Sequence, residues 1–547
     1  MFSKNKNSLK QFFGICRHFS SYIFWLTLLG IGISFLGVQF ALATKRIIDV
    51  ACGVVPGSFI NETLKLMLMV FLQLVLQIIN SRLYVSAAGK IEIHLRTDVF
   101  SELLRKRVSD LEKIPTGDLL SRINNDTSVI VSAVADIIPS AISLTSRLLF
   151  SLVALFMLDR SLAIICVVAA PLIFLASGIF RKKLKSYHKE YLKCEGKVRS
   201  FMIEAFNSVY VVKSFLKEKF FSDRAEELQN ESFKVRMKKN DFSIMTSTMF
   251  FVAVTFGYYI ALGWGAYKIS KGILTFGTLT AVLELLGQVE TPIRSISSLI
   301  PQWFAASASL ERIDELNSLQ ADDLPVSAEE ISDWERIDFS CVSFKYGETG
   351  ILNNFSASID RNSVVTVSGE SGIGKSTLFK LLLGFEKANS GEIVLVKKNG
   401  TKCALGSGTR CMFAYVPQVN LLTSGTVAQN IAFGNLVNYE RLEKCAKQAE
   451  LDGVIRSLPQ GFDTPLGENG LGLSEGEGQR VAIARALYSD ASVLLMDEGT
   501  SALDNETEKK IMENIRASGR TCILISHRDG AFGISDRTID LGRKKNE

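Results

Sequence analysis

Residues Gly369-Glu-Ser-Gly-Ile-Gly-Lys-Ser376 form the most informative segment of this 547-residue chain. A β-branched apolar run that ends at Val367 precedes the segment, and an apolar helical pattern follows it from Thr377. Glycines between a strand and a helix let backbone N–H groups wrap around phosphate oxygens, while the helix N-terminus adds the positive end of its dipole. The segment therefore predicts a nucleotide-binding loop, and its context argues against a glycine-rich turn without function.

The side chains of this loop suit ATP and Mg²⁺ as cofactors. We expect Lys375 to reach the β- and γ-phosphates and the Ser376 hydroxyl to be a ligand of the metal ion. The predicted nucleotide-binding residues of the loop are Gly369, Glu370, Ser371, Gly372, Ile373, Gly374, Lys375, Ser376 and Thr377.

Two adjacent carboxylates follow a hydrophobic run further along the chain. The run Val493–Met496 ends in Asp497 and Glu498. A buried strand that ends in two acids is a weak signal alone, but it becomes a strong one in a chain that also has a phosphate loop. It predicts that Asp497 holds Mg²⁺, directly or through water, and that Glu498 polarises the water that attacks ATP.

These motifs lie in a segment where short β-branched runs alternate with helical patterns, which indicates an α/β domain with a largely parallel sheet. The runs are 363–367, 392–396, 412–416, 492–496 and 521–525. Residues 317–333 are acidic and contain a proline, as is typical of a linker. We therefore place the nucleotide-binding domain at 334–547, after a linker at 317–333.

The first half of the chain, 1–316, has the pattern of a membrane domain. Each of its longest uncharged windows can cross a hydrocarbon core of about 30 Å as a helix. Three windows carry no charge, and three more are shorter or carry one to three charges, so we predict six transmembrane helices. The windows are 19–44, 66–81, 137–158, 161–180, 242–267 and 274–300.

The distribution of basic residues orients this domain. Residues 1–18, 82–136 and 181–241 hold 4, 8 and 16 Lys and Arg, whereas the segments on the opposite side hold six. The basic side is expected to be cytoplasmic, as the ATP chemistry also requires. Before the first span, apolar residues from Leu9 to Phe19 share one helical face, which predicts a helix at the membrane interface.

Composition excludes several other classes of protein. A hydrophobic fraction of 47% excludes disorder, and a net charge of only +6 does not favour binding to nucleic acid. The nine cysteines and four histidines show no CxxC pair and no zinc-binding spacing, so we expect reduced thiols.

Taken together, these residues resemble an ATP-binding cassette (ABC) transporter of the exporter type, over essentially the whole chain. The resemblance implies six spans fused to one nucleotide-binding domain, a second half-transporter as partner, and a lipid bilayer, here a bacterial inner or plasma membrane. It also assigns further residues: an adenine-stacking tyrosine, a Q-loop glutamine, a signature motif, a D-loop and a γ-phosphate sensor. Tyr346 is the implied adenine-stacking residue, and Gln418 is the Q-loop glutamine and also a Mg²⁺ ligand. The signature motif is Leu473–Arg480, in which Ser474, Gly476 and Glu477 bind nucleotide. The D-loop is Ser501–Asp504, and the γ-phosphate sensor is His527.

Within this resemblance, Glu498 and His527 are the predicted catalytic residues of an ATPase coupled to export by alternating access. A lone histidine after a strand is more often structural, and the resemblance favours the sensor role for His527. The implied coupling regions are 116–126 and 204–218, with an X-loop at 467–468. The transported substrate is not identified by these motifs, although an amphipathic molecule is expected.

Two features depart from the family pattern. The usual LSGGQ signature is Leu473-Ser-Glu-Gly-Glu477 here, and added carboxylates near a triphosphate should repel it. The chain also ends soon after His527. We favour a homodimer, and the altered signature keeps open a heterodimer with one weakened ATP site.

A function of another class also stays open, namely an ATP-gated channel or a regulatory membrane ATPase. Charged residues in the spans would suit a conduction path, and Arg147, Glu284 and Glu290 are the candidates at membrane depth. For Arg147 and Glu284, a position near a helix end is the alternative to a cavity. Our hypothesis is that these two shape an amphipathic substrate site together with Gln39, Gln73, Gln77 and Gln288.

Overall fold

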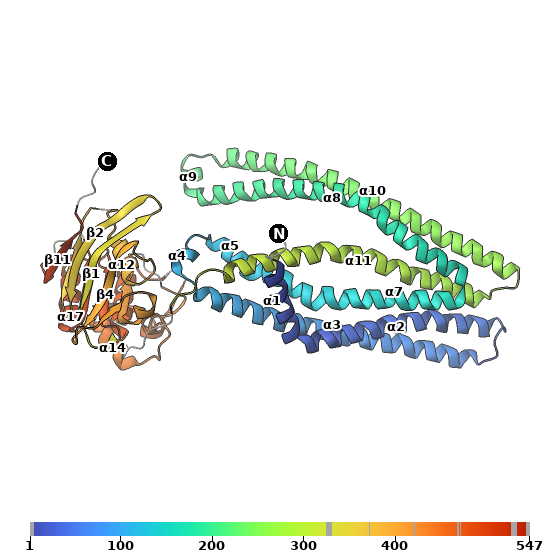
Figure 1. Cartoon of the computed structure of the whole chain (residues 1–547), viewed down its shortest axis with the longest axis horizontal. Helices are drawn as coiled ribbons and strands as arrows, with labels where there is room; N and C mark the ends of the chain where they lie inside the picture. The colour runs from blue at the N-terminus through green and yellow to red at the C-terminus, as the bar shows by residue number, and fades with distance from the viewer. Residues whose placement is uncertain are drawn as a thin grey trace. The chain divides into compact units, whose positions relative to one another are not determined.

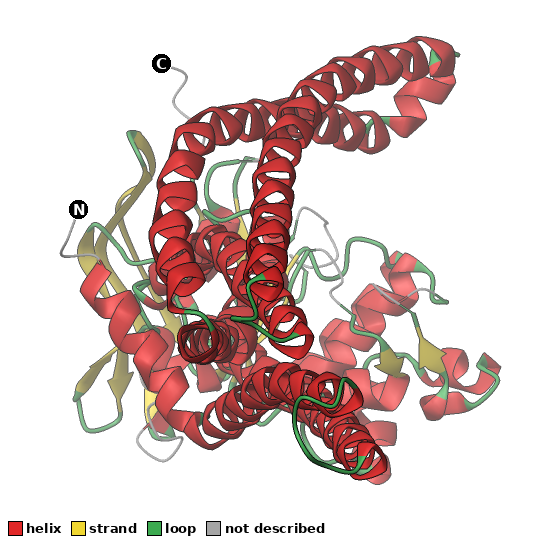
Figure 2. Cartoon of the chain, turned by 90° about the vertical axis from the view of Figure 1, so that its right-hand side faces the viewer, coloured by secondary structure: helices red, strands yellow, loops and turns green. Residues whose placement is uncertain are grey.

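The computed structural model describes residues 5–323, 331–370, 372–418, 422–467, 470, 472–526 and 533–542. The chain divides into two compact units. The helical unit comprises residues 1–101 and 116–317, and the α/β unit comprises residues 102–115 and 318–547. All of the strands among the described residues belong to the α/β unit, and Figure 2 draws them in yellow.

Six long helical stretches make up the helical unit in the described residues (Figure 1). A short helix, α1, precedes them, and another, α9, joins α8 to α10. The elements are α1 Asn5–His18, α2 Ser20–Ala51, α3 Phe59–Leu104, α5 Thr116–Ser121, η1 Arg122–Asp126, α6 Thr127–Ser132, η2 Ala133–Ile137, α7 Ile138–Leu158, α8 Arg160–Asn207, α9 Val209–Ser214, α10 Glu218–Ser270 and α11 Phe276–Asn317.

Four of these stretches are long and apolar enough to cross a membrane by length and composition. They are α2, α3, the stretch Thr116–Leu158 and α10. The other two predicted spans coincide with α8 and α11. In α8 the side chains of residues 165–179 lie outside the described part, and α11 carries the charges Glu284 and Glu290.

Small residues let these helices approach one another closely. A buried cluster joins α2, α7, α8, α10 and α11, and four of its eight members are alanines. By contrast, only 6% of the apolar window of α3 is buried, and large apolar side chains cover its surface. A bilayer solvates such a surface, so exposed apolar residues on α3 are what a membrane helix requires.

The stretch Thr116–Leu158 is one helix interrupted by two π turns, η1 and η2. The second turn directly precedes Pro139, which has no N–H to donate and would clash with a carbonyl in a regular α-helical turn. The first turn ends at Asp126, whose buried carboxylate accepts hydrogen bonds from Ser309 (2.9 Å) and from both Nε and Nη2 of Arg312 on α11. This ion pair ties the two helices together.

The α/β unit contains a parallel five-stranded sheet in the order β11-β3-β10-β9-β6. An antiparallel sheet has the order β2-β1-β4-β5, and β7 pairs with β8. The predicted run 392–396 therefore forms a strand, β4, of the antiparallel sheet. The strands are β1 Trp334–Tyr346, β2 Thr349–Asp360, β3 Val364–Ser368, β4 Ser390–Lys397, β5 Lys402–Ala404, β6 Phe413–Val416, β7 Gly425–Thr426, β8 Pro465–Leu466, β9 Val493–Asp497, β10 Thr521–Ile525 and β11 Arg537–Asp540.

Two hydrophobic cores support this unit. One lies between the two sheets and α12, and the other surrounds α13, α14 and α16. The helices are α12 Lys375–Leu382, α13 Val427–Ala432, α14 Tyr439–Gln448, α15 Asp452–Ser457, α16 Glu475–Tyr488 and α17 Asn505–Ala517.

The first coupling region, predicted at 116–126, begins where the chain passes from the α/β unit into the helical unit. Residues 116–126 belong to the helical unit, and the segment that packs with the α/β unit is the one before it, 102–115, which includes α4, Val108–Leu111. Arg107 donates its N–H to the carbonyl of Gln320 (2.9 Å), and Lys380 contacts Glu112 (3.3 Å). The assignment of 116–126 as a coupling region stays a prediction.

We predict that Asp126→Asn destabilises the helical unit by about 1–3 kcal/mol, because it leaves the hydrogen-bonded Arg312 without its charged partner. Half of the Arg312 side chain is exposed, so the expected loss of stability is smaller than for a fully buried ion pair. Thermal unfolding in detergent measures the change. Asp118→Asn is the control, because the Asp118 side chain, which pairs with Arg122, is 45% exposed against 5% for Asp126 and its loss should shift the Tm less. Equal shifts would contradict the interpretation.

Candidate functional site

The predicted phosphate loop connects β3 to α12. Its backbone adopts positive φ at three glycines, including +144° at Gly369 and +114° at Gly374. A Cβ atom added to Gly374 would lie 2.3 Å from Cγ2 of Ile351, so a larger residue does not fit there. The glycines are therefore required both for the backbone conformation and for the close approach to β2.

Lys375 extends into this loop rather than into solvent. Its ammonium group donates hydrogen bonds to the carbonyls of Gly369 (2.7 Å) and Glu370 (3.2 Å), and the residue is 6% exposed. The arrangement holds a largely buried positive charge inside the loop, against two of its backbone carbonyls. A triphosphate has the complementary charge and supplies the acceptors that such a loop binds.

Ser376 and Asp497 lie together although 121 residues separate them. Ser376 Oγ donates to Oδ1 of Asp497 (3.2 Å), and the Tyr415 hydroxyl lies 3.3 Å from Oδ2. Burial raises the pKa of the Asp497 carboxyl, whereas the hydrogen bonds from Ser376 and Tyr415 act to lower it. A hydroxyl and a carboxylate that converge beside a phosphate loop fit Mg²⁺, which prefers oxygen ligands.

Glu498 occupies a strained position directly after β9. Its φ is +51°, which is unusual for a residue other than glycine, and its N–H donates to the carbonyl of Ile525 at the end of β10 (3.1 Å). Gln418 donates from Nε2 to Oε2 of Glu498 (2.9 Å). The two predicted residues thus meet, and the amide fixes the carboxylate beside Asp497.

The signature segment forms the start of α16. Ser474 is the N-cap residue, and its hydroxyl accepts a hydrogen bond from the N–H of Glu477 (3.4 Å). The Glu477 carboxylate in turn accepts the N–H of Ser474 (2.7 Å), and the hydrogen bonds from Ser474 lower the pKa of Glu477. This capping box places an ionised carboxylate at the helix N-terminus where an LSGGQ motif has a neutral glutamine.

Two residues missed by the sequence reasoning support the site. Tyr415 on β6 hydrogen bonds Asp497, and Gln479 on α16 clamps the D-loop. Gln479 donates to Ser501 Oγ (2.9 Å) and accepts the N–H of Ala502 (3.0 Å), so it joins the signature helix to the loop after Glu498. The position of Gln479 in the sequence does not predict this contact, because Gln479 and the loop at Ser501 and Ala502 become neighbours only in the folded chain.

Of the other predicted residues, Tyr346 and Asp504 are described by the structure and three are not. Tyr346 is partly exposed at the end of β1, where its ring packs edge-on against Phe344, and desolvation raises its pKa. Asp504 caps α17 by accepting the N–H of Thr507 (3.0 Å), which gives it a structural task as well. Ser371, Glu468 and His527 lie outside the described residues.

Comparison with known families identifies the chain. A family model described as the ABC transporter transmembrane region matches residues 23–293, and one described as ABC transporter matches residues 352–501. The chain belongs to the ATP-binding cassette (ABC) transporter family. Membership of this ABC family confirms the predicted fold class, a helical membrane domain followed by an α/β ATPase domain.

Several relatives match most of this ABC transporter chain. A solved bacterial Atm1-family ABC exporter with ATP bound superposes with a TM-score of 0.77 at 25% identity, covering 97% of this chain and 95% of that one. An ATP-dependent lipid A-core flippase of Syntrophus aciditrophicus is 29% identical over 459 residues, which are 83% of this chain and 76% of the flippase. YheH of Bacillus subtilis, a probable multidrug resistance ABC transporter ATP-binding/permease protein, is 26% identical over 468 residues, 84% of this chain and 69% of its own.

The chain is thus an ABC exporter of a bacterial membrane, with a cytoplasmic ATPase domain whose hydrolysis of ATP is coupled to transport. Exporters of this kind generally dimerise within the lipid bilayer. This assignment confirms the predicted ATPase activity and membrane location.

We predict that Glu477→Gln lowers the KM for ATP by about fivefold, because it removes about 1 kcal/mol of repulsion between the carboxylate and a triphosphate at the N-terminus of α16. Glutamine keeps an acceptor for the Ser474 N–H, so the helix cap is preserved. ATPase rates over a range of ATP concentrations measure the change. Glu440→Gln, in the first turn of α14, is the control. An unchanged KM in Glu477→Gln would show that the carboxylate does not face nucleotide.

Proposed function

We propose that this chain is one half of a homodimeric exporter that uses MgATP to move an amphipathic molecule across the membrane by alternating access. In this proposal, residues 1–316 form the membrane domain, 317–333 the linker and 334–547 the nucleotide-binding domain. The observation that carries it is the convergence of Ser376, Asp497, Gln418 and Glu498 beside the phosphate loop. Four groups of complementary chemistry from three separate chain segments meet there.

Each group has a task that its geometry supports. Lys375 and the loop amides bind the phosphates, while Ser376, Asp497 and Gln418 would hold Mg²⁺. The metal ion neutralises charge on the phosphates when it is bound. Glu498 orients and polarises the attacking water, and Gln418 keeps its carboxylate in place. We retain the proposal that Tyr346 stacks on adenine and that His527 senses the γ-phosphate.

A second copy of the chain is proposed because the helical unit has an uncovered apolar tip. Around α9, between α8 and α10, Phe206, Tyr210, Phe215 and Leu216 are each at least 70% exposed. This tip lies within the predicted second coupling region, 204–218, outside the membrane windows. Exposed aromatic residues of this kind mark a protein contact. A second copy of the chain would supply that contact, because a coupling segment has to dock on a nucleotide-binding domain.

The rival arrangement is a heterodimer, and one observation favours it. Glu477 places a carboxylate on the signature helix although the residues of the phosphate loop and Glu498 are intact. A partner with its own normal signature would then complete a more active second site. The names of the relatives, a lipid flippase and a multidrug transporter, support an amphipathic cargo in either arrangement.

Replacing the proposed general base tests the mechanism. In Glu498→Gln, ATP binding should persist, while hydrolysis should fall by at least about 100-fold, because an amide cannot polarise water as a carboxylate does. Phosphate release and equilibrium binding of labelled ATP measure the two effects separately. Glu513→Gln, an exposed position on α17, is the control. Hydrolysis near the wild-type rate would remove Glu498 from the mechanism.

The oligomeric state separates the two arrangements. Expressed alone, the chain should purify as an ATP-hydrolysing dimer with about twice the protein mass of 60.4 kDa. Light scattering coupled to size-exclusion chromatography measures this mass, after correction for bound detergent. A monomer, or a dimer without ATPase activity, would instead support an obligate heterodimer.

A further inference from the structure

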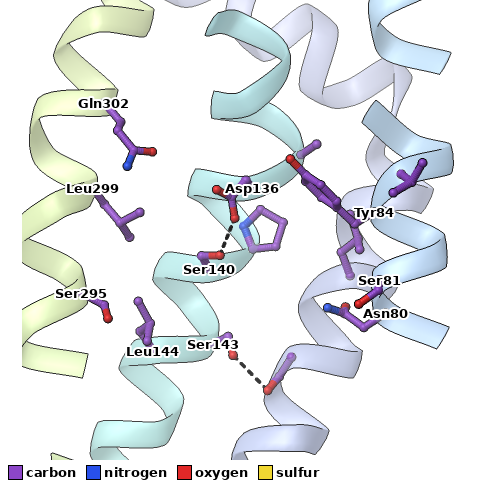
Figure 3. Close-up of a pocket in the computed structure, with 15 residues that line it drawn as sticks. Asn80, Ser81, Tyr84, Asp136, Ser140, Ser143, Leu144, Ser295, Leu299 and Gln302 are labelled. Atoms are coloured by element: carbon purple, nitrogen blue, oxygen red, sulfur yellow. Dashed lines mark hydrogen bonds between the residues drawn. The ribbon is translucent and has the colours of Figure 1, made fainter. Parts of the chain in front are cut away.

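A cavity of about 680 Å³ lies in the helical unit among α2, α3, the stretch that ends in α7, and α11 (Figure 3). None of the six residues that the sequence suggested for a substrate site lines it. Gln288, for example, donates a hydrogen bond from Nε2 to the carbonyl of Gly37 (2.8 Å) and so joins α11 to α2. The volume is within the range of about 300–1,000 Å³ that small-molecule sites occupy.

One wall of the cavity is held firmly. Ser143 on α7 donates its hydroxyl to the carbonyl of Gly30 on α2 (3.0 Å), and a Cβ atom on Gly30 would lie 2.9 Å from that of Ser143. Ser34 donates to the carbonyl of Ser143 (3.1 Å) one turn further along. Close contact between small residues fixes α2 against α7. The facing wall, on α3, packs less closely against the unit.

The polar groups of the cavity are unevenly distributed between donors and acceptors. Asp136 accepts one hydrogen bond from a protein side chain, the hydroxyl of Ser140 (2.8 Å). Oδ1 of Asn80 is buried and has no hydrogen-bond partner in the described part of the chain. Neither lysine nor arginine is among the described residues that line the cavity, and Asp136 is the carboxylate among them. The site therefore has spare acceptors and negative charge.

An aromatic ring and apolar side chains complete the lining. Tyr84 extends from α3 toward the η2 turn that carries Asp136 (Figure 3). Leu144 and Leu299 project into the same space from α7 and α11. A carboxylate beside an aromatic ring is the usual arrangement for binding a cation, and leucines suit the apolar part of the same molecule.

We propose that this cavity binds amphipathic cations, such as hydrophobic amines, and discriminates against amphipathic anions. The proposal rests on the proposed export function, whose substrate class it names. A carboxylate near the membrane, without a basic side chain among the described lining residues, attracts a cation strongly because few waters screen the charge. An amphipathic anion would be repelled by the same group.

Two ions of equal size and opposite charge test the proposal: tetraphenylphosphonium and tetraphenylborate. Their binding to the purified full chain is measured in neutral detergent without nucleotide. The cation should bind about tenfold more tightly than the anion, corrected for partition into protein-free micelles. Asp136→Asn should remove this preference by weakening cation binding, whereas Asp136→Glu should retain it. Asp223→Asn, an exposed acid on α10, is the control and should leave both affinities unchanged.

Equal binding of the two ions, or a preference unaffected by Asp136→Asn in protein that keeps its elution profile, would overturn the proposal. The test requires no ATP hydrolysis and is therefore separable from the export function. Charge-selective binding by a chain that lacks ATPase activity would support the cavity and contradict the exporter mechanism. Normal ATPase activity with equal binding of the two ions would support the exporter mechanism and contradict the proposal for the cavity.

Discussion

The contact between Ser376 and Asp497 is the constraint on which the ATPase site depends. These residues follow β3 and end β9, and one strand, β10, lies between those two in the parallel sheet. Parallel strands bring their carboxyl ends to the same edge, so the sheet order decides which side chains meet there. Burial raises the pKa of Asp497, and the hydrogen bonds from Ser376 and Tyr415 together with the charge of Lys375 counter only part of that rise. A site with this charge pattern is built to receive a metal ion and a triphosphate together.

The strained backbone of Glu498 lies at the same edge of the parallel sheet. The chain must turn sharply after β9 so that the carboxylate faces Gln418 rather than continuing into the core. The hydrogen bond from its N–H to the carbonyl of Ile525 holds that turn in place. Gln479 binds Ser501 and Ala502 a few residues later, so two hydrogen bonds tie the signature helix to the loop that follows the catalytic turn. This connection lies within a single chain and needs no partner to exist.

Much of this architecture was predictable from the sequence because local signals carry it. The phosphate loop and the acidic strand end have short, ordered patterns, and the observed β3 and β9 agree with the predicted runs to within one residue. The sequence predicted a largely parallel sheet but not the partners of each run, and the strand at 392–396 pairs antiparallel, since an isolated run does not specify the direction of its neighbours. Tyr415 and Gln479 were missed for a related reason. Their roles arise from contacts across 82 and 22 residues, which no local pattern encodes.

The membrane half illustrates a different limit. Uncharged windows locate helices, but they exclude the charged residues that a polar cavity needs, and the predicted site residues lie inside the windows. Asp136 lies one residue before the window 137–158 and was passed over. Its position in η2, next to Pro139, turns it toward Tyr84 and the cavity rather than toward the Arg312 pair that holds Asp126. Two acids ten residues apart in one helical stretch thus have opposite tasks. Arg312 pairs with Asp126 within the fold, whereas Asp136 lines the cavity proposed to receive a ligand, and the packing of α3 and α11 around the stretch distinguishes them.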